Sequence, residues 1–388
     1  MAGIYIHIPF CSQFCTYCNF YSVKQLGLRE QFVDALLGEA AVKRDFFKDT
    51  RSSVTTIYIG GGTPSVLPLP MLERLVGGVK ELFGLQSGIE EFTIEVNPND
   101  ITPEYAAGLV ALGVTRVSMG IQSFIASHLK WMNRRHTAEE GVCAFRILRD
   151  AGIKNISLDL IFGYELLSEE DWKYNIDRMT ALAPEHISAY QLSIESGSAL
   201  GAMARRGEYR GLSDAECEKQ YHLLQRKLSE AGYEQYEISN FAKRNSDGEV
   251  MKSQHNSSYW DGTPYLGLGP AAHSFNGKYA PDGPKRLWNT PSVKKYCNYY
   301  NKGEGLLSDI CGYEELSAEN IFDETIMLGL RRTCGFSLES LDKQFLSQIT
   351  PQINSLISNG LLVMEGDNVR IPAHKLFVSD FIIERLFV

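Results

Sequence analysis

The first half of this 388-residue chain alternates between two hydrophobic periods, and this alternation limits the folds open to it. Six short runs rich in aliphatic and β-branched residues are typical of strands: 4–8, 54–59, 91–96, 114–119, 155–160 and 186–192. Amphipathic stretches of helical period lie between them, including 31–47, 69–82, 104–112 and 139–151. This order predicts an α/β fold with parallel strands and helical crossovers. Because a closed barrel would need eight such units, we predict an open partial (β/α)6 barrel.

The alternation of strand and helix signals weakens after residue 195, and the rest of the chain predicts further regions. We expect the sheet domain to span 1–235, ending in a helix at 213–231 and a strand at 233–238. Residues 236–315 are rich in Gly, Asn, Pro and Tyr, which predicts an irregular connecting region. Residues 316–388 predict a small helical, winged-helix-like C-terminal domain, with helices near 320–331, 338–346 and 350–359 followed by a hairpin.

The charge balance argues against the usual use of a winged helix. Lys and Arg total 38 and Asp and Glu total 47, which gives a net charge of −9. Asn354, Ser355 and Ser358 supply no basic recognition face, so we expect no nucleic-acid partner and place a DNA-contacting regulator last. We also find no apolar run long enough for a membrane span and no leader-like start. We therefore expect a cytoplasmic protein, for which only peripheral membrane contact remains open.

Three of the eight cysteines are grouped with CxxxCxxC spacing directly after the first expected strand: Cys11, Cys15 and Cys18. The other five are scattered, and we expect them to be free thiols. A 4Fe–4S cluster normally takes four cysteines, so three would leave one iron open to a small molecule. A zinc site is the alternative, but it would need a fourth ligand, and no second cysteine pair is present.

This motif, in this position, resembles the radical S-adenosylmethionine (SAM) superfamily. Residues 5–11, which read YIHIPFC, resemble the opening of the oxygen-independent coproporphyrinogen III oxidase family, and the similarity continues through 186–192 to the final helical region. The resemblance implies a radical SAM partial barrel with a 4Fe–4S cluster on Cys11, Cys15 and Cys18. It also implies SAM on the open iron, reductive cleavage to a 5′-deoxyadenosyl radical, and an electron donor as a partner.

Several polar residues lie at or after the expected strand ends, where parallel β/α sheets bind ligands. Carboxylates there can accept from ribose hydroxyls or an ammonium group, and an arginine can bind a carboxylate. Taken singly, each could equally be a cap, a turn or a solvated charge, and the glycine run at 60–62 could be a plain tight turn. The resemblance implies that the SAM contacts are Tyr5, Tyr17, Gly61, Gly62, Thr63, Glu95, Gln122, Arg134 and Asp159.

Two features indicate a branch within this family. The oxidases carry a fourth cysteine in a CxxxCxxCxC pattern, whereas this chain has Phe20 at that position. Residues 255–260, HNSSYW, resemble the HNxxYW motif of the haem-chaperone branch. The motif implies His255 as a haem ligand, since imidazole binds haem iron and aromatic rings suit the macrocycle. A hydrogen-bonded loop histidine is the alternative, and His273 is a weaker second candidate.

The function predicted from these features is that of a haem chaperone. It would bind haem, a 4Fe–4S cluster and SAM, and would transfer haem to an apo-haemoprotein acceptor. The alternative is a radical SAM enzyme acting on a porphyrin, by oxidative decarboxylation of coproporphyrinogen III or by opening or alkylating haem. Because Phe20 replaces the fourth cysteine, we expect no coproporphyrinogen III oxidase activity and assign no catalytic residue.

Overall fold

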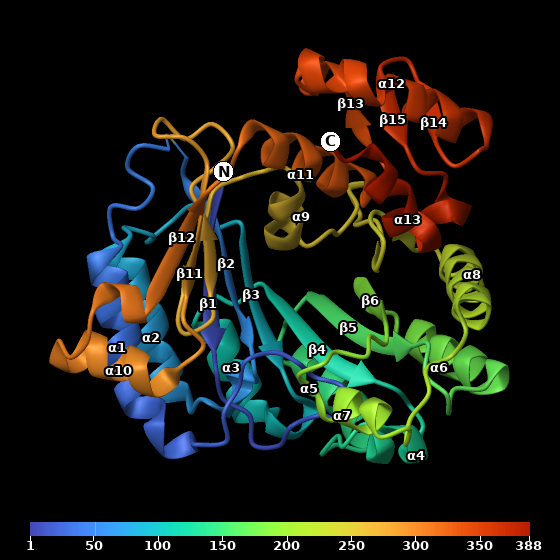
Figure 1. The fold of residues 1–388 in the computed structure, drawn as a ribbon. Coiled ribbons are helices and arrows are strands. Elements are labelled where there is room, and N and C mark those ends of the chain that lie inside the picture. The colour runs from blue at the N-terminus through green and yellow to red at the C-terminus, as the bar shows by residue number, and fades with distance from the viewer. Residues whose placement is uncertain (51) are drawn as a thin grey trace.

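The computed structural model describes residues 1–50 and 52–388 and is built on one large twelve-stranded sheet (Figure 1). The six predicted strands form its centre and pair in parallel in chain order: β1 (Ala2–Ile8), β2 (Val54–Gly61), β3 (Glu91–Val96), β4 (Arg116–Gln122), β5 (Asn155–Phe162) and β6 (His186–Gln191). Their crossovers contain α1 (Arg29–Val42), α2 (Leu69–Leu82), α3 (Pro103–Ala111), α4 (Ala126–Trp131), α5 (Ala138–Asp150) and α6 (Glu169–Leu182). The sheet stays open, since β12 and β7 are its two edges. The predicted partial barrel is confirmed.

Residues 236–315 are more regular than the sequence indicates. After α7 (Ala199–Arg205) and α8 (Asp214–Glu230), the chain adds strands at both sides of the central six. These elements are β7 (Glu234–Gln235), β8 (Asn240–Ala242), α9 (Gln254–Trp260), β9 (Tyr265–Leu268), β10 (His273–Phe275), β11 (Lys285–Asn289), α10 (Val293–Lys302) and β12 (Cys311–Glu315). β9 pairs in parallel with β1, and β8 pairs antiparallel with β6. Such short strands carry almost no periodic signal, because long-range pairing rather than local sequence stabilises them.

The C-terminal region combines helices with a small three-stranded sheet, as expected. Its elements are α11 (Ala318–Leu330), β13 (Phe336–Ser337), α12 (Lys343–Ser358), β14 (Val363–Glu365), β15 (Asn368–Arg370) and α13 (Ser379–Ile383). The two helices expected near 338–346 and 350–359 are instead mainly one helix, α12, which continues through Pro351. Burial of Ile349 and Ile353 on both sides of the proline gives this helix a continuous apolar face, which offsets the missing backbone donor.

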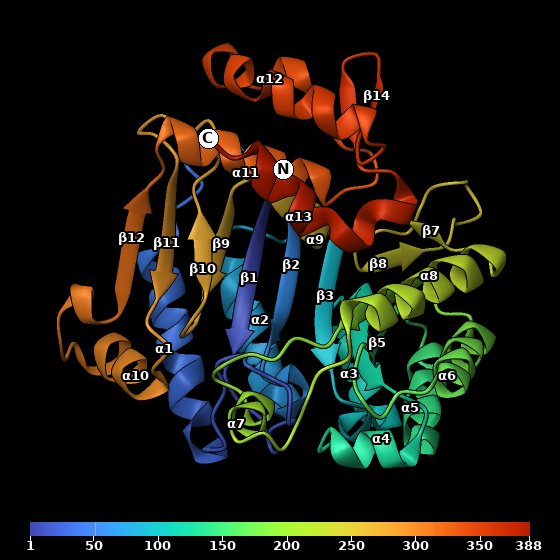
Figure 2. The same ribbon diagram turned by 45° about the vertical axis from the view of Figure 1, so that its right-hand side comes forward.

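The two ends of the parallel strands face different parts of the molecule. Figure 2 shows the C-terminal region and α9 above the starts of β1–β3, while α4, α7 and the segment after β1 lie at the opposite end. Among the described residues, no helix combines the length and apolar character that crossing a membrane requires. The carboxyl ends of the central strands therefore gather one set of predicted site residues, and α9 presents another at a distance.

Candidate functional site

The segment after β1 folds back on itself and carries the three clustered cysteines. Its two sides are joined by backbone hydrogen bonds: Cys11 N donates to the Val23 carbonyl at 3.1 Å, and Val23 N donates to the Pro9 carbonyl at 2.8 Å. Within the loop, Cys18 N donates to the Cys15 carbonyl at 3.3 Å. Cys11 is buried, and the other two cysteines are half-buried. The loop thus holds three thiols near one another and partly shielded from water.

Burial keeps the Cys11 and Cys18 thiols protonated in the absence of a cation. It raises the pKa of Cys18 to about 11 and also raises the pKa of Cys11, whereas the nearby Arg134 guanidinium lowers both. Because thiolate is the metal-binding form, iron binding must displace these protons. Among the described residues, no three His, Cys, Asp or Glu side chains are grouped so that they could hold a single metal ion.

The glycine turn after β2 lies directly against the cysteine loop. Gly62 N donates to the Ile8 carbonyl at 2.9 Å, and the Thr63 hydroxyl lies 3.3 Å from Cys11 Sγ. A Cβ on Gly62 would come within 2.7 Å of the Phe10 carbonyl oxygen and 3.1 Å of Cys11 Sγ. Only glycine fits so close to both groups, so the predicted association of this turn with the cluster loop has a steric basis.

Glu95, on β3, fixes the same turn from the neighbouring strand. Its carboxylate accepts from Gly61 N at 3.1 Å and from the Tyr58 hydroxyl at 2.8 Å. Burial raises the pKa of Glu95 to about 7, although the hydrogen bond from Tyr58 lowers it. The carboxylate is therefore available as a structural acceptor and has a pKa near neutrality.

Arg134 connects the cluster loop to the end of β4. Its Nη2 donates to the Gly120 carbonyl at 2.6 Å, and its Nη1 lies 3.4 Å from Cys15 Sγ. Arg134 Nε and Gln122 Oε1 are buried atoms without a hydrogen-bond partner among the described residues. Gln122 also adopts a left-handed backbone conformation, with φ of 67°. Unused donors and acceptors beside the thiols are what a polar ligand would satisfy, so these residues fit SAM.

The remaining predicted SAM residues surround the same site. The Tyr5 hydroxyl lies 3.0 Å from His7 Nδ1, and Tyr17 is close enough to Cys15 and Cys18 for their charges to affect its pKa. Asp159 accepts from the Ser118 hydroxyl at 3.4 Å, and burial raises its pKa to about 6. The structure thus brings the predicted cluster and SAM residues to the carboxyl end of the sheet, except Tyr5, which lies in the middle of β1.

Two buried residues near Glu95 and Asp159 were not predicted from the sequence. Tyr58 binds Glu95, as described above, and its ring centroid lies 6.1 Å from that of Tyr5. Arg116 is 1% exposed, and its Nε and Nη1 have no hydrogen-bond partner among the described residues. Its charge lowers the pKa of both Glu95 and Asp159, against the larger effect of burial. A charged residue at the start of an otherwise apolar strand is the signal that could have identified it.

His255 is not placed as an accessible ligand. It lies in α9, at the other end of the strands, and is 0% exposed. Its Nδ1 is 2.8 Å from the Thr56 hydroxyl, and its Nε2 is 2.9 Å from the Tyr259 hydroxyl. Both ring nitrogens are therefore already hydrogen-bonded, and neither is free to bind iron in this conformation. The alternative of a hydrogen-bonded histidine describes the observed geometry, with the residue in a short helix instead of a loop.

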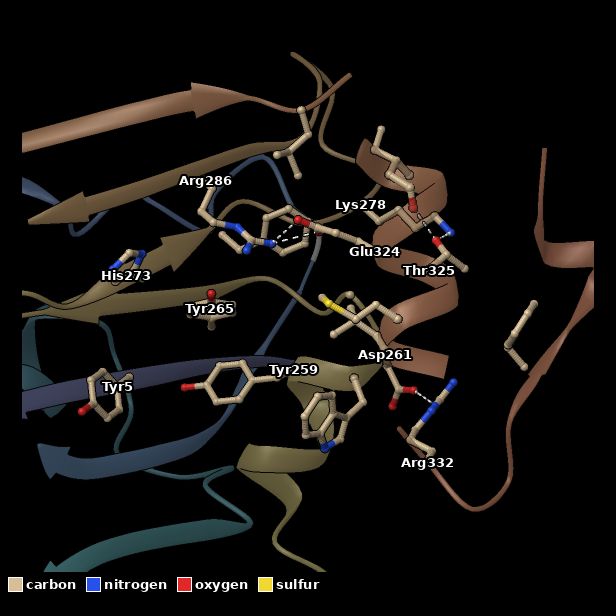
Figure 3. A pocket seen from close by; sticks show the side chains of 18 of the residues that line it. Tyr5, Tyr259, Asp261, Tyr265, His273, Lys278, Arg286, Glu324, Thr325 and Arg332 are labelled. Atoms are coloured by element: carbon tan, nitrogen blue, oxygen red, sulfur yellow. Dashed lines mark hydrogen bonds and ion pairs between the residues drawn. The ribbon is translucent and has the colours of Figure 1, made fainter. Parts of the chain in front are cut away.

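A cavity of about 870 Å³ is lined by residues of the sheet and of the C-terminal region, and also by Asn19, Phe20 and Tyr21 of the segment after β1. Figure 3 shows its residues coming from β1, α9, β9–β11 and α11. The aromatic part includes Tyr5, Tyr259, Trp260, Tyr265 and Phe275, and the basic part includes His273, Lys278, Arg286 and Arg332. Its volume is within the roughly 300–1,000 Å³ typical of small-molecule sites. Aromatic walls with cationic groups suit a flat ligand that carries carboxylates.

Two ion pairs and one hydrogen bond fix three basic side chains of this cavity. Arg286 pairs with Glu324 at 2.9 Å, Arg332 pairs with Asp261, and Lys278 donates to the Thr325 hydroxyl at 3.1 Å (Figure 3). His273 is exposed, and partial burial of its ring lowers its pKa, which favours the neutral, metal-binding imidazole.

Comparison with known proteins gives consistent results. The Radical SAM superfamily matches residues 5–206. The heme chaperone HemW of Mycobacterium tuberculosis (strain ATCC 25618 / H37Rv) is 32% identical, over 99% of this chain and 94% of its own. That of Bacillus subtilis (strain 168) is 31% identical, over 93% of each. Among solved structures, the radical SAM enzyme coproporphyrinogen III oxidase (HemN) from Escherichia coli superposes with a TM-score of 0.81 at 21% identity, covering 100% of this chain and 90% of that one, which shows a shared fold.

Proposed function

Because this chain belongs to the radical SAM superfamily and, within it, to the family of the heme chaperones HemW, we propose that it binds haem and transfers it to apo-haemoproteins. The cavity of about 870 Å³ carries the proposal. It combines aromatic walls, which can pack on a macrocycle, with Lys278, Arg286 and Arg332, which can pair with propionates. Lys278 is the most available of the three, since its partner Thr325 is neutral.

His273 is the histidine best placed to bind the iron of this cargo. It lines the cavity, is exposed, and has a lowered pKa, so a neutral imidazole is presented at physiological pH. His255 would have to break its bond to Thr56 or to Tyr259 and leave its buried position before it could do the same. We therefore transfer the proposed ligand role to His273 and keep His255 as part of the haem site in a different capacity.

On the segment after β1, whose Asn19, Phe20 and Tyr21 also line the cavity, Cys11, Cys15 and Cys18 would hold a 4Fe–4S cluster. The cluster supplies one-electron redox chemistry and an open iron for the methionine group of SAM. Arg134 is placed to receive the methionine carboxylate through its unpartnered Nε, and Gln122 Oε1 can accept from the ligand. Gly61, Gly62 and Thr63 approach the loop closely enough to line the same ligand, and Glu95 and Asp159 supply acceptors. Tyr5 and Tyr17 would flank it.

Haem, an apo-haemoprotein and an electron donor are the proposed partners, with the cytoplasm as the proposed location. A radical SAM enzyme that acts on a porphyrin is the second candidate, because the fold is shared with a coproporphyrinogen III oxidase. Phe20, where the oxidases have a fourth cysteine, argues against that activity.

The test is anaerobic reconstitution with iron and sulfide, followed by haem titration and an assay for coproporphyrinogen III conversion. We expect saturable binding of about one haem per chain and no conversion. Alanine at His273 should change the haem spectrum and weaken binding. Steady turnover of coproporphyrinogen III with SAM would assign the chain to the enzyme class instead.

A further inference from the structure

The start of α9 is fixed to the sheet by one carboxylate. Glu91, on β3, accepts from the backbone N–H of Gln254 at 2.8 Å and of His255 at 3.0 Å, and from the Ser253 hydroxyl at 3.3 Å. These bonds satisfy donors that the first turn of a helix leaves free. The position of the His255 backbone is therefore set by β3 and not by the cavity.

The imidazole of His255 fits into a space that the sheet leaves for it. A Cβ on Gly3 would lie 2.9 Å from its Cε1, so the strand at this point accepts only glycine beside the ring. Thr56 holds Nδ1, and the Tyr58 ring packs at a centroid distance of 5.2 Å and an angle of 31°. Burial lowers the pKa of His255 to about 3, so the ring is neutral and has one donor and one acceptor.

Tyr259 lies one helical turn further along, on the same side of α9. Its hydroxyl lies 2.9 Å from His255 Nε2, and the planes of the two rings make an edge-on angle of 83°. Unlike His255, Tyr259 lines the cavity, where its ring packs edge-on against Tyr265 at 4.6 Å. Figure 3 shows its hydroxyl end directed toward Tyr5 across the cavity.

The residue after Tyr259 also lines the cavity and carries a donor that is unpaired among the described residues. Trp260 lines the cavity, and its indole Nε1 is a buried donor that no hydrogen-bond acceptor satisfies within the described part of the chain. A buried donor of this kind is normally paired, so an acceptor on a bound ligand would complete it. The end of α9, not its start, is therefore the part that meets a ligand.

We propose that His255 is a positioning residue for the haem site and that it acts through Tyr259, a residue of α9 that contacts haem. This inference rests on the proposed haem function. His255 joins the sheet to Tyr259 through Thr56, so the ring of Tyr259 is held ready in the cavity wall before haem arrives. Direct ligation by His255 would require the loss of one of these hydrogen bonds and a movement of the buried ring out of its place beside Gly3.

The test is a double-mutant cycle measured by haem titration of the reconstituted chain. We expect His255→Ala and Tyr259→Ala each to weaken haem affinity about tenfold, and the double variant to be no weaker than Tyr259→Ala alone. His255→Gln, whose amide can still bond to Tyr259, should recover part of the affinity. In each variant the spectrum of the haem iron should keep the wild-type ligation. Tyr174→Ala is the control, since Tyr174 is an exposed tyrosine on α6 outside the cavity, and it should change affinity less than threefold.

Thr56→Val covers the case in which the His255 variants fail to fold. It removes the bond to Nδ1 with little change in shape, and we expect a smaller loss of affinity in the same direction, with normal cluster content. The proposal is overturned if His255→Gln removes an imidazole ligand from the haem spectrum while Tyr259→Ala leaves affinity unchanged. It is equally overturned if the two losses multiply in the double variant. Wild-type protein that binds no haem would instead contradict the proposed function itself.

Discussion

Two buried side chains at opposite ends of the parallel sheet, Arg134 and His255, differ in how completely their polar atoms are satisfied. At the carboxyl end, Arg134 Nε and Gln122 Oε1 are buried without partners beside three thiols. At the amino end, His255 has both nitrogens bonded and no exposed surface. A buried polar group without a partner indicates a missing ligand, whereas a fully bonded one indicates a structural role. The difference teaches that a residue in a recognisable motif can serve the site without touching the ligand.

The largest expected effect concerns the thiols. Cys18→Ala should abolish the absorption of the reconstituted cluster, because a loop with two thiols cannot hold three irons. Cys143→Ala is the control, since Cys143 is an exposed thiol outside this loop and should leave iron and sulfide content unchanged. Full iron and sulfide content in the Cys18 variant would contradict the assignment of the cluster to this end of the sheet.

Substitution of His255, at the amino end of the sheet, should lower the stability of the fold. His255→Ala removes two buried hydrogen bonds and leaves a cavity, so we expect the free energy of unfolding to fall by about 2–4 kcal/mol. His273→Ala, at an exposed position, should change it by less than about 0.5 kcal/mol while altering the haem spectrum. Denaturant unfolding of the two apo variants measures this contrast. Equal stability of both would mean that His255 is not structurally engaged.

Substitution of Arg134, at the carboxyl end of the sheet, should lower the affinity for SAM. Arg134→Ala is expected to weaken SAM binding by about 1.5–3 kcal/mol, the range for a charge-assisted hydrogen bond. Arg135→Ala is the neighbouring control, since Arg135 pairs with Asp100 at 2.8 Å. Calorimetric titration of the reconstituted variants compares them. If the Arg134 variant bound SAM with unchanged affinity, Arg134 would contact only Gly120 and Cys15 and would not bind SAM.

The smallest effect is a pH dependence from Glu95. Its pKa is about 7 in the folded chain and is raised by burial, so the folded state retains a proton that the unfolded state releases at lower pH. Stability from this group is therefore full below its unfolded pKa and is lost as pH rises toward 7. We expect Glu95 to contribute a loss of about 1.5 kcal/mol between about pH 5.5 and about pH 7, because the limiting slope of 1.36 kcal/mol per unit falls off near the folded pKa. Glu95→Gln should flatten this slope, and an unchanged slope would contradict the burial effect.

The sequence predicted the centre of the fold and the carboxyl-end site because both depend on local signals. Long apolar strands and amphipathic helices have clear periods, and strand ends place Glu95 and Asp159 at one edge. β9–β12 were missed because their pairing partners are distant in the sequence. The burial of His255 was missed for the same reason, since Gly3, Thr56 and Glu91 surround it only after folding.

The central claim is haem transfer, and the most direct measurement starts from the reconstituted chain loaded with haem. It is mixed with an apo-haemoprotein, and the acceptor's absorption is followed with time. The account predicts about one haem per chain before mixing and its movement to the acceptor, with slower or absent loading in His273→Ala. Haem that stays on the chain, or that is chemically altered in the presence of SAM and a reductant, would contradict it.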